Sequence, residues 1–371
     1  MSESRTGRLA SLDALRGFDM FFITGGATLI TALCTAFGFG DGWLARQMEH
    51  VPWAGLAHHD TIFPLFLFLA GVTWPFSLAA QQAKGRTSGQ IHRKILMRAA
   101  LLFAFGLAYG GIFNLRPDFR IPSVLGQIGL SWGLAALLFV HVRKPVHRLL
   151  LIAGVLVGYW AILRFTLAPD AVAGVGSFSR EGNIISWLDR TLMSNHIHVR
   201  GVYDPESLFS CPNGMALALM GMCAGSVLRS DAWSGVRKTQ ILFGASLAAL
   251  TLAALFVFVL GDVVVKALWT SSFVLTTAGY SLAMLALFHW VIDVKGWSGW
   301  TLYFRVIGMN SITIYLAQRV GVVRPVHDFL FGGLVKCIGG PWGAVVAATT
   351  YCAVVWALLH FLYRRNIFLR V

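Results

Sequence analysis

Long apolar runs recur along the whole sequence, and they constrain the fold of this chain more than any other feature. Each has about 20 residues and few charges, which is the length of helix that crosses the hydrocarbon core of a bilayer. Hydrophobic residues make up 57% of the 371-residue chain and charged residues only 12%, whereas about 25% is charged in a soluble domain. The runs cover residues 12–35, 60–80, 96–114, 122–141, 149–168, 212–229, 239–260, 271–293, 302–320 and 341–363.

These runs predict an all-α polytopic membrane protein with about ten transmembrane helices. No second domain stands out, so we treat residues 1–371 as a single transmembrane domain. With the N-terminus inside, 19 of the 30 Lys and Arg residues fall on the inner side. Because basic loops are retained in the cytoplasm, this bias predicts an N-in and C-in topology.

Charge and cysteine content exclude several classes of function. The net charge of +14 is explained by basic inner loops, and no basic face interleaved with aromatics predicts nucleic-acid binding. The five cysteines lack C-x-x-C spacing, so we expect neither a disulfide framework nor a metal site. Phosphate-binding, dinucleotide-binding, G-x-S-x-G and H-E-x-x-H motifs are also missing.

Two polar segments lie on the predicted outer side, at residues 36–59 and 169–211, and segments of this length are usually functional when they are not disordered. The first holds His50, which is either a surface residue or a catalyst. Asp60, at the start of the second run, either caps a helix or belongs to a site. Adjacent His58 and His59 point about 100° apart on a helix, so we do not expect them to bind one metal.

Ionisable residues at membrane depth usually pair or face a functional path. Asp13 and Arg16 are three residues apart and share a helix face, so they form either an interfacial pair or a site for an anion. Lys266 either extends to the membrane surface or contacts a ligand. Asn310 either forms a hydrogen bond between helices or contacts a ligand. A transporter and an intramembrane enzyme therefore both remain open.

The stretch "YDPES" at residues 203–207 is read as a turn that enters the sixth run. Its Asp204, Glu206 and Ser207 are candidates for the cap of that helix, because such side chains accept hydrogen bonds from free amides.

Six motifs occur in order along nearly the whole chain. They are "RLASLDALRGFDMFFITGG" (8–26), "HVPWAGLAHHDTIFPLFLFLAGV" (50–72), "VLGQIGL" (124–130), "YDPESLFSCPNGMALALMGMCAG" (203–225), "KALWTSSFVL" (266–275) and "VIGMNSITIYLA" (306–317). In this order they resemble the heparan-α-glucosaminide N-acetyltransferase family of transmembrane acetyltransferases, in its bacterial branch.

The resemblance implies a reaction across a membrane. The family transfers an acetyl group from cytoplasmic acetyl-CoA to the amino group of a terminal glucosamine on the far side. For this chain it implies an acyl-CoA donor, an amino-sugar or glycan acceptor, a place in the bacterial inner membrane, and a homodimer as one possibility. The competing function is a multi-helix transporter of a sugar or small anion.

The resemblance also implies roles for single residues. His50 matches the proposed catalytic histidine, as general base or acyl-accepting nucleophile, and Asp60 is expected to orient it. Thr24 stands where lysosomal members carry an asparagine that assists catalysis. Asp13, Arg16, Lys266 and Asn310 are expected to bind the acyl-CoA. Trp53, Tyr203, Asp204 and Trp269 are expected to contact the acceptor.

Overall fold

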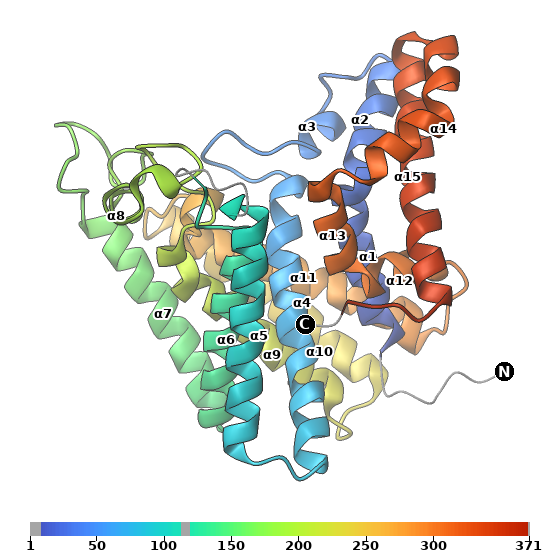
Figure 1. Cartoon of the computed structure of the whole chain (residues 1–371). Helices are drawn as coiled ribbons and strands as arrows, with labels where there is room; N and C mark the ends of the chain where they lie inside the picture. The colour runs from blue at the N-terminus through green and yellow to red at the C-terminus, as the bar shows by residue number, and fades with distance from the viewer. Residues whose placement is uncertain (1–8, 113–118, 370–371) are drawn as a thin grey trace.

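The protein is a bundle of long helices, as shown by a computed structural model that describes residues 9–112 and 119–369 (Figure 1). Only isolated β-bridges accompany the helices in these ranges. The helices are α1 (Ala10–Phe21), α2 (Ala27–Ala36), α3 (Trp43–Gln47), α4 (His58–Ala83), α5 (Ser88–Tyr109), α6 (Val124–His141), α7 (Pro145–Phe165), α8 (Ile184–Leu192), α9 (Cys211–Arg229), α10 (Gly235–Phe258), α11 (Ser271–Phe288), α12 (Leu302–Met309), α13 (Ser311–Val320), α14 (Val323–Ile338) and α15 (Gly340–Arg364). The predicted all-α polytopic membrane fold is confirmed.

Eight helical segments in the described ranges are long and apolar enough to cross a membrane. The described parts of the two other predicted runs are largely helical, but each run departs from a plain span; residues 113 and 114 of the run 96–114 lie outside the described residues. Helix α5 carries Arg93, Lys94 and Arg98 in its first half, and the ninth run is divided at Asn310 into α12 and α13. The number of crossings and the N-in and C-in orientation remain predictions.

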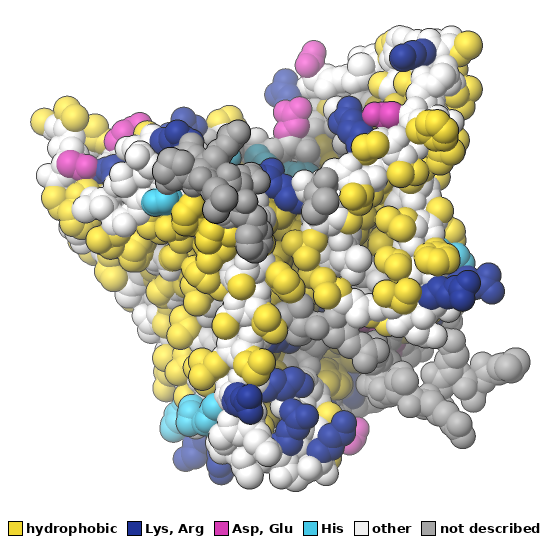
Figure 2. Space-filling view, viewed as in Figure 1, with side chains coloured by type: hydrophobic (Ala, Val, Ile, Leu, Met, Phe, Trp, Pro, Cys, Tyr) yellow, Lys and Arg dark blue, Asp and Glu magenta, His cyan; other side chains and the backbone are white. Residues whose placement is uncertain are grey.

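Charged side chains gather at the two ends of the bundle, and apolar side chains cover its flank (Figure 2). We call one end the basic end; it holds the turns at residues 84–87, 142–144 and 230–234. We call the opposite end the loop end; it holds residues 37–57 and 166–210, including the short helices α3 and α8. This distribution is the one that a bilayer around the flank requires.

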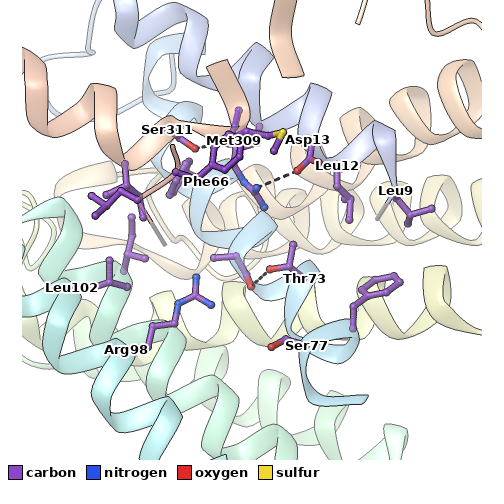
Figure 3. Close-up of a pocket in the computed structure, with 18 of the residues that line it drawn as sticks. Leu9, Leu12, Asp13, Phe66, Thr73, Ser77, Arg98, Leu102, Met309 and Ser311 are labelled. Atoms are coloured by element: carbon purple, nitrogen blue, oxygen red, sulfur yellow. Dashed lines mark hydrogen bonds and ion pairs between the residues drawn. The ribbon is translucent and has the colours of Figure 1, made fainter. Parts of the chain in front are cut away.

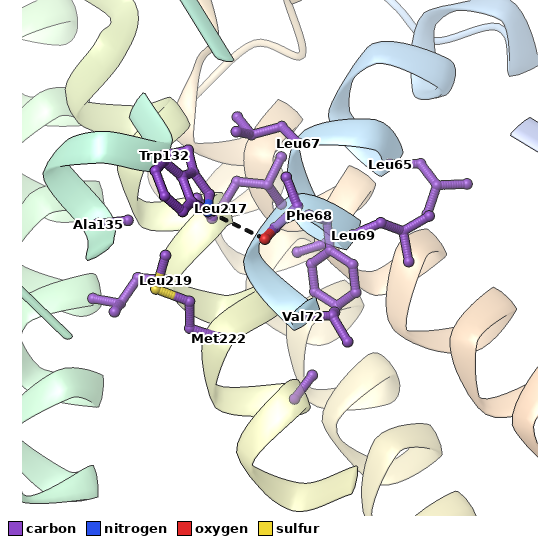
Figure 4. Packing of buried hydrophobic residues seen from close by; sticks show 14 of the residues in the cluster. Leu65, Leu67, Phe68, Leu69, Val72, Trp132, Ala135, Leu217, Leu219 and Met222 are labelled. Atoms are coloured by element: carbon purple, nitrogen blue, oxygen red, sulfur yellow. Dashed lines mark hydrogen bonds between the residues drawn. The ribbon is translucent and has the colours of Figure 1, made fainter. Parts of the chain in front are cut away.

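Close packing of α4 against α9 forms the centre of the bundle. A Cβ on Gly71 would come within 2.2 Å of the Ala218 carbonyl oxygen, and one on Gly221 would come equally close to that of Phe68. Small residues at such contacts let membrane helices approach closely. Trp132 of α6 completes this core and donates from Nε1 to the Ala70 carbonyl at 3.2 Å (Figure 4).

A π-helical turn at Phe22–Gly26 joins α1 to α2, and Gly25 has a φ of 124° there, which favours glycine. Helix α1 packs on α12 so tightly that a Cβ on Gly17 would overlap the Phe304 carbonyl. This contact fixes the face of α1 that carries Asp13 and Arg16 against a cavity described below.

Candidate active site

The segment between α3 and α4 is attached to the segment that precedes α11. The amide of Gly55 donates to the Val264 carbonyl at 2.9 Å, and Ala54 forms an antiparallel bridge with Val265. Gly55 has a φ of 114°, so a side chain at this turn would be strained. This attachment brings Lys266 beside His50, although the two are 216 residues apart in sequence.

His50, Asp60 and Lys266 form one cluster at the loop end. His50 Nδ1 lies 2.7 Å from Asp60 Oδ1, and Lys266 Nζ lies 3.1 Å from the same oxygen and 3.0 Å from His50 Nδ1. The Asp60 side chain is fully buried, while that of His50 is 55% exposed. The buried carboxylate therefore holds an imidazole that a ligand can reach.

The hydrogen bonds of Asp60 assign the protons of this cluster. Its Oδ2 accepts from the amides of Val51 and Ala57, each at 3.2 Å, so Asp60 also caps the start of α4. Lys266 Nζ and these two amides already surround the carboxyl group, which favours the carboxylate, a group that only accepts. His50 Nδ1 lies closer to this carboxylate, at 2.7 Å, than to Lys266 Nζ, at 3.0 Å. The proton of the imidazole is therefore assigned to Nδ1, and Nε2 retains a lone pair. This is the tautomer that a general base needs.

A cavity of about 200 Å³ opens at this cluster, and we call it the histidine cavity. It reaches from the polar loop end into apolar side chains of several helices. Its lining residues are Met20, Ile23, His50, His59, Ile62, Phe63, Phe66, Val124, Leu125, Ile128, Glu206, Lys266, Ser311, Ile312 and Tyr315. The His59 ring lies 4.5 Å from that of His50, centroid to centroid, so the structure brings His59 to the cavity as well.

A larger cavity of about 730 Å³ lies toward the basic end, and we call it the arginine cavity. Figure 3 shows it between Arg98 on one side and Asp13, Met309 and Ser311 on the other. Arg16 and Arg229 also line it, and Arg16 Nη1 lies 3.5 Å from Asp13 Oδ1. The walls thus combine three cationic side chains with apolar ones.

Arg98 is placed to receive a ligand in the arginine cavity. Its guanidinium lies over the Trp132 ring, 4.2 Å from the centroid. Its Nε is buried, and none of the residues that the structure describes accepts a hydrogen bond from it. A buried cationic donor of this kind favours an anionic ligand.

The two cavities share one wall, which makes them neighbours within the bundle. The residues common to both are Phe66, Leu125, Ile128, Ser311 and Ile312. The arginines near the basic end and the imidazole at the loop end therefore face two spaces separated only by shared side chains. A long ligand that displaced these side chains would contact both ends of the path.

Other predicted residues lie around this path. Thr24 is buried in the π-helical turn, where its hydroxyl donates to the Phe21 carbonyl at 3.3 Å. Asn310 donates to the Val306 carbonyl at 3.2 Å, at the break between α12 and α13. Neither residue is among those that line the two cavities. The predicted roles of both remain predictions without a contact to support them.

The predicted acceptor residues divide into two groups. Trp53 packs edge-on against Tyr203, with ring centroids 5.0 Å apart, at the loop end. Trp269 is fully buried at a φ of 49°, and its carbonyl accepts from Asn213 Nδ2 at 2.7 Å. Trp269 therefore positions the segment of Lys266, while Trp53 and Tyr203 are partly exposed.

Asp204 belongs to a charged cluster beside the histidine cavity. Arg120 Nε donates to Asp204 Oδ2 at 2.8 Å, and Arg120 Nη2 also contacts Glu206. Burial lowers the pKa of Arg120, but Asp204 and Glu206 outweigh that and raise it above its usual value. Burial raises the pKa of nearby Asp189 to about 7, although its Oδ1 accepts from the Ser207 hydroxyl.

The motif "YDPES" is therefore only partly a capping turn. Ser207 caps a short 3₁₀ helix before α9 by accepting from the Phe209 amide at 3.1 Å, and Asp204 accepts from the Glu206 amide at 2.9 Å. Glu206 instead lines the histidine cavity. Sequence reasoning missed Arg98, Arg120 and the place of Glu206. The position of charged Arg98 inside an apolar run of the sequence was the signal that could have identified it as a functional residue.

Comparison with known proteins supports the family to which the sequence motifs point. The chain is similar to heparan-alpha-glucosaminide N-acetyltransferase of Homo sapiens, with 27% identity over 376 residues that cover 85% of this chain and 54% of the relative. The enzyme of the same name from Mus musculus is 25% identical over 375 residues, with 84% and 54% covered. No family model matches the chain.

The chain spans about half the length of the curated relatives that it matches. The similarity nevertheless covers most of this sequence. It supports membership of the heparan-α-glucosaminide N-acetyltransferase family, as the six motifs predicted.

Proposed function

We propose that this multi-pass membrane protein is a transmembrane N-acetyltransferase that moves an acetyl group from acetyl-CoA to the amino group of a terminal glucosamine or similar amino sugar. The similarity to N-acetyltransferases supports the reaction class. One observation carries the proposal for the site: an imidazole oriented by a buried carboxylate faces a cavity that adjoins a second, arginine-lined cavity.

The arginine cavity is proposed to bind the donor. Its volume of about 730 Å³ lies within the usual range of small-molecule sites, about 300–1,000 Å³. Arg16, Arg98 and Arg229 supply the cationic donors that the phosphates of coenzyme A require. We place the basic end in the cytoplasm of a bacterial cell, with the loop end beyond the inner membrane, because basic loops remain inside.

The direct route needs one base and one aligned thioester. His50 Nε2 removes a proton from the acceptor ammonium, and the freed nitrogen attacks the thioester carbonyl carbon. The new C–N bond forms as the C–S bond breaks, and coenzyme A leaves as its thiolate. The thiolate takes the second amine proton, which gives the amide and the free thiol of coenzyme A. A positioned general base contributes about 10²–10⁴-fold to such a step. Asp60 holds the tautomer, and Lys266 lies where it can polarise the carbonyl.

A covalent route uses the same atoms in another order. His50 Nε2 attacks the thioester, releases coenzyme A and carries the acetyl group until the amine takes it. We favour the direct route because it requires only a base and positioning. Ping-pong kinetics and trapping of acetylated His50 in the absence of acceptor support the covalent route instead.

The test compares purified wild type with His50→Ala in the presence of acetyl-CoA and glucosamine, and it follows free coenzyme A and N-acetylglucosamine by mass spectrometry. His147→Ala is the matched control, because His147 is exposed at the start of α7, near the basic end. We expect product from wild type and the control and none from His50→Ala. Unchanged turnover in His50→Ala refutes both routes. Binding of acetyl-CoA or sugar without release of coenzyme A favours the transporter.

A further inference from the structure

The histidine cavity has one carboxylate that the proposed chemistry does not use. Glu206 lies on the cavity wall together with His50 and Lys266, and its side chain is only 12% exposed. A carboxylate at such a position costs free energy unless a cation compensates it. The charges around Glu206 therefore indicate what the cavity can bind.

Among the described residues near Glu206, the Asp60 and Asp204 carboxylates each have a cation as a partner, whereas Glu206 has none of its own. Lys266 pairs with Asp60, which is fully buried. Arg120 pairs with Asp204, which is also fully buried and accepts further from the His198 amide at 2.7 Å. Glu206 shares the Arg120 guanidinium through Oε2, but a single guanidinium balances only one of the two carboxylates. Among the residues that the structure describes, one negative charge thus remains without a cation of its own at the cavity wall.

We propose that Glu206 is the residue that binds the ammonium group of the acceptor, and that it thereby selects amino sugars over their neutral counterparts. This inference rests on the proposed function, because it assigns the acceptor side of the same site. Arg120 holds Glu206 through Oε2, and none of the described residues hydrogen-bonds Oε1. Oε1 is the atom that receives the ammonium.

The positions of Glu206 and His50 also explain why the acceptor first binds as an ammonium and loses its proton afterwards. A carboxylate stabilises the protonated amine on arrival, since a charge-assisted hydrogen bond is stronger than a neutral one. His50 lines the same cavity of about 200 Å³, and its Nε2 is proposed to take the proton once the acetyl group is in place. Glu206 is therefore expected to act mainly on acceptor binding, whereas His50 acts on turnover.

The test uses glucosamine and glucose as a matched pair of probes, which differ by the amino group. Binding of each to the full-length protein in detergent is measured by calorimetry without donor, for wild type, Glu206→Gln and Glu181→Gln. The control replaces a carboxylate that is exposed at the loop end and does not line the cavity. Glu206→Gln keeps a hydrogen-bond acceptor for Arg120 and removes only the charge.

We expect wild type and the control to bind glucosamine more tightly than glucose, and Glu206→Gln to lose roughly tenfold or more of glucosamine affinity with that for glucose unchanged. Equal binding of both sugars by wild type overturns the proposal. So does an equal loss for both sugars in Glu206→Gln, which indicates a structural role. If Glu206→Gln does not fold, Glu206→Asp is used instead, because it keeps the charge and should still bind glucosamine more tightly than glucose. Loss of this preference for glucosamine in folded Glu206→Asp counts against the proposal.

The same variants separate this inference from the proposed function. An active wild type whose acceptor KM is unchanged in Glu206→Gln refutes the inference and leaves the acetyltransferase standing. A wild type that binds glucosamine through Glu206 but releases no coenzyme A refutes the acetyltransferase and leaves the ammonium site standing.

Discussion

Replacement of Asp60 by asparagine tests the assigned proton positions most directly. The carboxylate accepts from His50 Nδ1, from Lys266 and from two backbone amides. An amide of the same shape has one oxygen and one NH₂ group. If its oxygen keeps the bonds to the backbone, its NH₂ group faces His50 Nδ1. The imidazole then accepts at Nδ1 and carries its proton on Nε2, where it can no longer act as a base.

The size of the effect follows from the function that is lost. A general base is worth about 10²–10⁴-fold in rate, which corresponds to roughly 2.7–5.5 kcal/mol of transition-state stabilisation. We therefore expect kcat of Asp60→Asn to fall about 10²–10⁴-fold. The change also leaves Lys266 without its counterion, and breaking a buried pair costs about 3–5 kcal/mol of stability. That cost is smaller here because the Lys266 side chain is 16% exposed.

The assay measures initial rates at saturating donor and acceptor, together with thermal unfolding in detergent. The double variant Asp60→Asn/Lys266→Met removes the stranded cation as well. We expect it to recover part of the unfolding temperature but none of the lost kcat. A folded Asp60→Asn protein whose kcat stays within threefold of wild type contradicts the reasoning. So does a loss of rate that only follows the loss of folded protein.

Three further predictions concern the donor, pH and packing. Arg98→Leu should raise KM for acetyl-CoA roughly tenfold or more and leave KM for glucosamine unchanged, because it removes a charged donor from the arginine cavity. Burial raises the pKa of Asp189 to about 7, so its contribution to stability should be complete below pH 4 and lost as pH rises through 7; Asp189→Asn should flatten this dependence of the unfolding temperature. Gly221→Ala should destabilise by about 1–3 kcal/mol, because its Cβ overlaps the Phe68 carbonyl.

Each of these predictions has its own control. Arg143→Leu, at an exposed position in the α6–α7 turn, should leave both KM values unchanged. The unfolding temperature of wild type is expected to fall as pH rises from 5 to 8. If it rises instead, and Asp189→Asn removes that rise, the predicted sign is wrong and the assigned burial of Asp189 is refuted. Gly244→Ala is matched to Gly221→Ala, because nothing lies within 4 Å of its Cβ; a helix propensity gain of up to about 1 kcal/mol is expected there.

The helical segments were predictable because the bilayer reduces the problem to one pattern. A span must satisfy its own backbone hydrogen bonds, so a long apolar run such as that of α10 has few alternatives to a helix. The same pattern did not show that α12 and α13 are separate helices, because residues 302–320 form one apolar run in the sequence although the helix is interrupted at Asn310.

The site was predictable only in part. His50 and Asp60 are ten residues apart, and their motif pointed to both. The position of Lys266 beside this pair depends on the bridge between Ala54 and Val265, which no local pattern encodes. Glu206 was read as a capping candidate because a sequence shows only its nearest neighbours, whereas its partner Arg120 lies 86 residues away.

The sequence by itself determined that this chain is a bundle of apolar helices, with polar residues at a few defined depths, because burial in lipid follows from composition and run length. Tertiary structure decided which of these polar residues share a cavity and which charges remain uncompensated. Such pairings depend on contacts between distant segments. Gly17 and Gly221 permit an approach that larger side chains would prevent, and Gly55 adopts a positive φ at the turn that meets Val264. Electrostatic energies depend on distance and burial, and only the folded chain fixes both.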